Sequence, residues 1–197
     1  METESRAGDP VAELPDGTGL SDADRRLLLR LARSALTAYL SGDPAPVVPT
    51  DRPALQRRCA VFVTLRDGRG ALRGCRGEMV ARRPIGEAVL RTVLASATAD
   101  PRFPPVTVEE VDRLRIEISA LSPLRPITPD AVEVGRHGLM LRCGPFVGVL
   151  LPQVPVAQNW DRDGFLDGLC LKAGLPGRAW EAPGSELLAF EAEVWEE

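Results

Sequence analysis

A single cysteine lies between two arginines in the short run LRGCRGE. Cys75 is flanked by Arg73 and Arg76. A nearby cation stabilises a thiolate, and the thiolate is the form of cysteine that acts as a nucleophile. The residue types therefore predict a nucleophilic or redox cysteine. The same pattern is also typical of a tight bend that buries a small cysteine side chain, so both interpretations stay open.

Two glycines border the same cysteine. Gly74 and Gly77 can adopt positive φ angles and allow another backbone to approach closely. Backbone N–H groups in such a turn can converge on an anion. We therefore expect Gly74 and Gly77, together with Arg73 and Arg76, to bind a small anionic ligand beside Cys75.

A nucleophilic cysteine usually works with a base, most often histidine. His137 is the only histidine of the chain and lies in the glycine-rich stretch VGRHGL. It is therefore the candidate base, and a structural role in a turn is the alternative. Glu78, Glu117 and Asp100 are the acids that could orient or replace it.

A second arginine with possible function lies in the stretch ADPRFPPV. Arg102 stands between prolines there, directly after a predicted helix end. An arginine held in a rigid loop suits recognition of a carboxylate or phosphate. Arg102 is therefore a candidate ligand-binding residue, and pairing with a neighbouring acid is the alternative.

The remaining cysteines predict neither a metal site nor a cofactor motif. Cys59, Cys143 and Cys170 form no CxxC pair with each other or with Cys75, and one histidine is too few for a standard zinc site. No Walker loop, GxGxxG run or HExxH motif is present. We expect these three cysteines to be core residues and the thiols to be reduced.

Composition and charge restrict the classes of protein that remain. The net charge of -4 gives no support for nucleic-acid binding. Lys172 is the only lysine among 24 basic residues, and the arginines are scattered along the chain, as a codon bias would leave them. No apolar run approaches the ~20 residues that span a bilayer, and no secretory leader is recognised. These features predict a cytoplasmic protein without a membrane anchor.

The elements around these residues predict an α+β fold with a mostly antiparallel sheet and flanking helices. A length of 197 residues fits one domain, or one domain with a small lobe. Residues 1–20 lack hydrophobic periodicity and predict a disordered leader. The expected elements are a helix after Ser21, a hairpin over 59–75 that turns at Asp67-Gly68, a helix from Pro84 to Ala99, a strand over 114–121, a hairpin that turns at Gly144-Pro145, a loop LLPQVPVAQNW, a helix after Asp161, and a strand in which Leu188, Phe190, Ala192 and Val194 share one face.

Eight ordered stretches together resemble one known family, the AMMECR domain family, whose bacterial members are called AmmeMemoRadiSam system protein A. The resemblance covers about residues 21–197. The stretches are FVTL at 62–65, LRGC with Gly77, ADPRFPPV at 99–106, IEISALSP at 116–123, VGRHGL at 134–139, GVLLPQV at 148–154, WDRDGFL at 160–166 and LCLKAGLP at 169–176.

This resemblance implies a larger and a smaller lobe with a cleft between them. The activity of the family is not established, and its LRGC segment is a suspected functional site. The family name implies association with a Memo-type protein and a radical-SAM protein. Two hypotheses follow: a small enzyme or enzyme component with a cysteine-centred site, or a non-catalytic domain that binds a ligand or docks those partners.

Two positions depart from the family pattern. Arg76 follows the signature cysteine where the family usually has isoleucine. Gln158 lies where the family commonly has a glutamate before its tryptophan region. Any mechanism that needs that glutamate is therefore in doubt for this chain.

Overall fold

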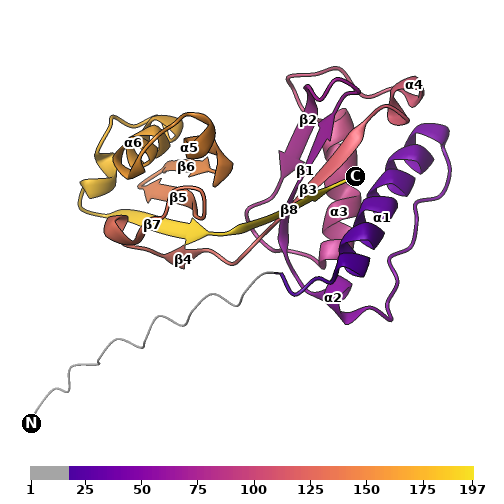
Figure 1. Cartoon of the computed structure of the whole chain (residues 1–197), viewed down its shortest axis with the longest axis horizontal. Coiled ribbons are helices and arrows are strands. Elements are labelled where there is room, and N and C mark those ends of the chain that lie inside the picture. The colour runs from indigo at the N-terminus through magenta and orange to yellow at the C-terminus, as the bar shows by residue number, and fades with distance from the viewer. Residues whose placement is uncertain (1–17) are drawn as a thin grey trace, which may run out of the picture.

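The computed structural model describes residues 18–197 and arranges them in two lobes side by side (Figure 1). Each lobe is built on a four-stranded antiparallel sheet, with strand order β2-β1-β3-β8 in the first and β4-β7-β5-β6 in the second. Helices cover these sheets, so the predicted α+β class is confirmed.

The first lobe places two long helices on one face of its sheet. Its elements are α1 (Asp22–Ser41), α2 (Pro53–Gln56), β1 (Ala60–Arg66), β2 (Leu72–Gly77), α3 (Ile85–Thr98), α4 (Val108–Val111), β3 (Arg115–Leu121) and β8 (Ala192–Glu196). The N-terminus of α1 is fixed by a capping box between Ser21 and Asp24. Helix α3 packs on β1 and β2, and α1 packs on α3. Burial of apolar side chains between these layers forms the larger of the two main cores.

The β1–β2 hairpin forms as the sequence predicts. The Asp67 carboxylate accepts hydrogen bonds from the backbone N–H groups of Arg69 and Ala71, both at 2.9 Å, which closes the turn. Successive strand residues point to opposite faces. Val61 and Val63 therefore lie in the core against α3, whereas Phe62 and Thr64 face away from the helices.

The second lobe has its own apolar core. Its elements are β4 (Arg125–Pro126), η1 (Pro129–Ala131), β5 (Gly138–Cys143), β6 (Phe146–Leu150), α5 (Gln153–Ala157), α6 (Arg162–Lys172), η2 (Ala179–Glu181) and β7 (Ser185–Phe190). Asp161 caps α6, as predicted, by accepting a hydrogen bond from the Gly164 N–H at 2.9 Å. Phe165, Leu166 and Leu169 are fully buried beneath this helix.

Two expectations for this part of the chain are wrong. The stretch after β6 contains the short helix α5 rather than only a loop. The C-terminal alternating stretch forms two strands in different sheets, β7 and β8, which meet at Glu191. There the Ser122 N–H donates to the Glu191 carbonyl, and the Glu191 N–H donates to the Ser122 hydroxyl. These bonds join the two chain connections between the lobes (Figure 1).

The predicted leader lies mostly outside the described residues. Its last part is ordered, because Leu20 is buried and the Thr18 N–H donates to the Glu193 carboxylate at 2.9 Å. No helix among residues 18–197 has the length and apolar character to cross a membrane.

Candidate functional site

Cys75 lies on β2, an edge strand of the first sheet. It pairs with Thr64 on β1, and Thr64 pairs in turn with Glu117 on β3. Because Val63 lies in the core against α3, this row of three side chains occupies the sheet face away from the helices. The Thr64 hydroxyl donates to the Cys75 sulfur at 3.4 Å. The half-buried sulfur therefore has a hydroxyl donor on one side.

A buried carboxylate holds the backbone of the same cysteine. The Cys75 N–H points out of the sheet edge and donates to Asp100 Oδ2 at 2.8 Å. Arg102 donates to Asp100 from Nε at 2.9 Å, from Nη2 at 2.7 Å and from its backbone N–H at 3.1 Å. The Asp100 side chain is only 3% exposed. One carboxylate thus joins the LRGC stretch to the ADPRFPPV stretch.

The environment of Asp100 fixes its protonation state. The hydrogen bond from the Arg102 guanidinium holds the Asp100 pKa well below its usual range, against the opposing effect of burial. The N–H groups of Cys75 and Arg102 lower this pKa further. Because Asp100 is ionised and accepts four hydrogen bonds, its oxygens are occupied, and we assign it a positioning role rather than that of a base.

The positively charged Arg102 is linked to the Cys75 backbone through Asp100. The Asp100 hydrogen bond raises the Arg102 pKa, and the charge of Cys75 adds a smaller upward contribution. The guanidinium lies 5.5 Å from the centre of the Phe103 ring and its side chain is 55% exposed. Its Nη1 donates no hydrogen bond within residues 18–197. A positively charged edge is therefore open on the arginine that shares Asp100 with the Cys75 backbone.

Arg73 has a different role from the one expected. Its Nε and Nη2 donate to the Glu110 carboxylate at 2.7 and 3.0 Å. Its Nη1 and Nη2 also reach the carbonyls of Pro104 and Pro105 at 2.9 and 3.3 Å. Every nitrogen of the guanidinium has a protein partner. Arg73 therefore anchors the proline-rich loop to β2, and these contacts do not direct it at a ligand beside Cys75.

Arg76 lies on an exposed part of β2. Its side chain makes no hydrogen bond or ion pair with any other described residue, whereas its backbone N–H donates to the Ser96 hydroxyl at 3.0 Å. That hydroxyl lies 2.7 Å from the Val63 carbonyl, to which it donates. Because side chains alternate along β2, Arg76 and Cys75 point to opposite faces of the strand.

The two glycines next to Cys75 serve helix packing and ring packing. Neither Gly74 nor Gly77 has a positive φ, so the predicted anion-binding turn is wrong. The expected close approach is confirmed. A Cβ on Gly74 would lie 2.1 Å from the Ser96 carbonyl oxygen of α3, and one on Gly77 would lie 2.3 Å from the Phe62 ring. These glycines are strand residues that α3 and Phe62 approach from opposite faces.

His137 lies in the second lobe, directly before β5. Its side chain is buried, and its Nδ1 accepts a hydrogen bond from the Glu133 N–H at 3.0 Å. Burial lowers the pKa of His137, and the negative charge of Glu133 partly offsets this effect. No hydrogen bond joins it to Cys75. These contacts favour the structural alternative, a histidine that closes a turn. Of the acids that could replace His137, Glu78 pairs with Arg83 and Glu117 pairs with Arg66.

The buried His137 predicts a specific pH dependence of stability. Its folded-state pKa lies below the ordinary value of 6.5, so the unfolded chain takes up the proton first as the pH falls. Its contribution to stability is therefore complete above the unfolded pKa and declines as the pH falls through that value. In the His137→Asn variant, an amide oxygen can replace Nδ1 without titrating. Urea unfolding from about pH 8 to about pH 5 should show a shallower decline in the variant.

The other thiols differ from Cys75 in their surroundings. Cys59 donates to the Leu121 carbonyl at 3.5 Å, and burial raises its pKa to about 11. Burial also raises the pKa of Cys170 on α6. Cys143 is half-buried at the end of β5. Within residues 18–197, no cluster of three or more histidine, cysteine, aspartate or glutamate side chains could hold a metal ion.

Sequence comparison now places the chain among known proteins. The sequence profile of AMMECR1 matches residues 29–195. The chain belongs to the AMMECR1 family. A relative from Thermococcus gammatolerans is 41% identical over 189 residues, which span 90% of this chain and 92% of that protein. Protein MK0488 from Methanopyrus kandleri is 40% identical over 191 residues, with 92% of each chain covered.

A solved AMMECR1 relative has the same fold. The crystal structure of the uncharacterised protein PH0010 from Pyrococcus horikoshii superposes with a TM-score of 0.78 at 41% identity, and covers 87% of this chain and 90% of that chain. The family assignment therefore gives the fold and no established activity. Asp100 and Thr64 are the site residues whose roles the sequence did not reveal. In the sequence, Asp100 is marked by its position two residues before Arg102, and Thr64 by being a polar residue within an apolar strand.

Proposed function

We propose that this AMMECR1 protein is an enzyme, or a component of one, in which Cys75 is a reactive thiol beside a binding site for a small anionic compound. The observation on which this proposal depends is the double role of Asp100. Its buried carboxylate holds the Cys75 N–H and the Arg102 guanidinium at once. The Cys75 backbone and an arginine with an open edge are thus held by one group.

The local electrostatics favour an anion at this place. Asp100 is ionised, so it neutralises part of the Arg102 charge, but the outer edge of the guanidinium faces solvent. A bound carboxylate or phosphate could take two hydrogen bonds from that edge. The Thr64 hydroxyl donates to the sulfur and thereby restricts the position of the thiol. In this proposal Arg102 binds the anionic ligand and Thr64 orients the thiol.

The proposal predicts charge-dependent alkylation of Cys75. In this reaction the thiolate sulfur attacks the carbon that bears iodine, a C–S bond forms, iodide leaves, and the thiol proton passes to water. Iodoacetate has a carboxylate, whereas iodoacetamide is neutral and nearly the same size. We expect the iodoacetate-to-iodoacetamide rate ratio at Cys75 to exceed that of glutathione. Arg102→Gln should lower the ratio about three- to fivefold, the size expected of a half-exposed ion pair.

Matched variants make this measurement specific. Arg102→Lys keeps the charge and should retain most of the ratio, and Arg82→Gln removes an exposed arginine elsewhere and should leave it unchanged. Peptide mass spectrometry after partial alkylation assigns the rate to Cys75 and not to Cys59 or Cys170. A ratio equal to that of glutathione, or one unaffected by Arg102→Gln, would contradict the anion site.

A non-catalytic role is the second candidate, and the surroundings of His137 favour it. The candidate base is bonded to Glu133 in the other lobe, and Asp100 is saturated. On this alternative the domain docks a Memo-type protein or a radical-SAM protein. Capture of those two partners by the untreated and the Cys75-alkylated protein separates the candidates. If the domain only docks its partners through another surface, the untreated and the alkylated protein should capture them equally. The Cys75→Ser variant should then also retain function.

The proposed location is the cytoplasm. All four cysteines are free, and disulfides are rare in that compartment. A reactive Cys75 thiol also needs a reducing environment to persist. The proposed partners of the AmmeMemoRadiSam group would act in the same compartment.

A further inference from the structure

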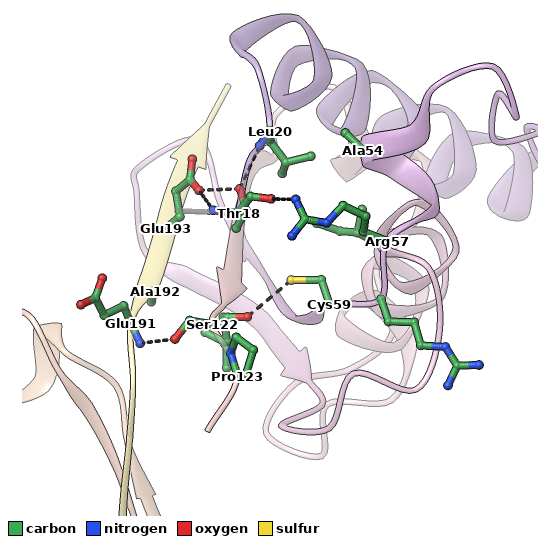
Figure 2. Close-up of a pocket in the computed structure, with 13 residues that line it drawn as sticks. Thr18, Leu20, Ala54, Arg57, Cys59, Ser122, Pro123, Glu191, Ala192 and Glu193 are labelled. Atoms are coloured by element: carbon green, nitrogen blue, oxygen red, sulfur yellow. Dashed lines mark hydrogen bonds between the residues drawn. The ribbon is translucent and has the colours of Figure 1, made fainter. Parts of the chain in front are cut away.

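A second site is visible where the chain passes between the lobes. A cavity of about 320 Å³ lies beside the Ser122–Pro123 connection and the Glu191–Ala192 connection (Figure 2). Its apolar walls are supplied by Leu20, Ala54, Ile85, Leu121, Pro123 and Ala192. None of the lining residues belongs to the Cys75 site. The volume falls in the range of ordinary small-molecule pockets.

The acids around this cavity already have cationic partners. Glu193 accepts the N–H of Thr18 and forms an ion pair with Arg25. Glu191 forms an ion pair with Arg136 at 2.7 Å. Each carboxylate therefore already has an arginine partner, which it shares with a second acid outside the cavity.

Arg57 and Arg58 are the two cations of the lining, and neither pairs with an acid of the described residues. Arg57 Nη1 donates to the Thr18 carbonyl at 3.1 Å (Figure 2). A carbonyl oxygen satisfies one N–H but does not neutralise the charge. The cavity therefore combines apolar walls with the positive charges of Arg57 and Arg58.

The Cys59 thiol forms a neutral part of the same wall. It donates to the Leu121 carbonyl, and its raised pKa of about 11 keeps it protonated at neutral pH (Figure 2). A protonated, hydrogen-bonded thiol is a weak nucleophile. A compound in this cavity would thus be held by non-covalent contacts.

We propose that this cavity binds a small organic anion with an apolar body, whose charged group pairs with Arg57. The apolar part would lie between Ile85 and Leu121, away from water. This inference is independent of the proposed thiol chemistry, because the two sites share no residue. It assigns the junction of the lobes a ligand of a definite class, a short-chain or single-ring carboxylate.

Three probes of equal chain length test the proposal. Hexanoate, hexan-1-ol and hexylammonium each have six carbons and carry an anionic, a neutral and a cationic head group, respectively. Isothermal titration calorimetry with the full-length protein should give saturable binding at millimolar hexanoate, weaker binding of the alcohol, and none of the ammonium. Binding to the folded state alone should also raise the unfolding temperature with hexanoate concentration.

Variants connect this binding to the cavity. Arg57→Gln should weaken hexanoate binding about fivefold and leave hexan-1-ol unaffected, since only the ion pair is lost. Ala54→Leu should abolish binding of both by filling the space. Arg82→Gln, the matched exposed control, should bind hexanoate normally. Cys75→Ser should also bind it normally, which separates this site from the proposed function. Absence of hexanoate binding, or binding that neither Arg57→Gln nor Ala54→Leu weakens, would overturn the proposal.

Discussion

Asp100→Asn is expected to lower the free energy of unfolding by about 2–3 kcal/mol. The carboxylate is almost fully buried and accepts hydrogen bonds from the Cys75 N–H and from Arg102. An asparagine amide nitrogen would face one of these donors, and the guanidinium would lose its counter-charge. Because the Arg102 side chain is 55% exposed, solvent reduces the charge contribution. Most of the loss therefore comes from the buried hydrogen bonds.

The same variant has a clear dependence on pH. The Asp100 pKa is depressed in the folded state, so the carboxylate contributes its stability above the unfolded-state pKa and loses it as the pH falls toward the folded value. The difference between wild type and Asp100→Asn should therefore be largest near neutral pH and shrink in acid. Urea unfolding at several pH values measures it. Asp43→Asn, at an exposed aspartate, should change little. A difference that grows in acid would contradict this assignment of Asp100.

The elements that could be predicted are those with strong local signals. The capping box of Ser21 and Asp24 and the Asp67-Gly68 turn are short-range features, and the structure contains both. The break at Glu191 was not predicted, because alternation of apolar residues continues through it. Only the hydrogen bonds with Ser122, a residue distant in sequence, show that the chain changes sheets there.

The candidate site shows the same limit. Pairing of Arg102 with a neighbouring acid was one of the alternatives drawn from the sequence, and the Asp100–Arg102 pair is what the structure contains. That Asp100 also holds the Cys75 N–H depends on how α3 places the loop that follows it. The sequence suggests His137 as the base for Cys75 only because nucleophilic cysteines usually work with a histidine. The division of the chain into two lobes, which sequence spacing cannot reveal, places them in different lobes.

Gly74→Ala is the substitution for which we expect the largest effect in this chain. An added Cβ would lie 2.1 Å from the Ser96 carbonyl oxygen, and this obstacle is helix backbone rather than a side chain that could rotate. Either α3 or β2 must move, which we expect to cost about 3 kcal/mol as an overpacking defect. At about 2–4 °C per kcal/mol for a chain of this size, the unfolding temperature should fall by roughly 6–12 °C.

The same displacement should reach the thiol, because Gly74 precedes Cys75 and Ser96 bonds the Arg76 N–H that follows it. We therefore expect Gly74→Ala to reduce the preference of Cys75 for iodoacetate over iodoacetamide in the fraction that remains folded. Gly68→Ala is the matched control: its Cβ would make only ordinary contacts, the nearest at 3.7 Å, so stability and alkylation should be unchanged. If Gly74→Ala unfolds like wild type, α3 can shift without cost and the glycine is not needed for packing. If it is destabilised but keeps the full iodoacetate preference, Asp100 and Arg102 hold their places independently of the β2–α3 contact.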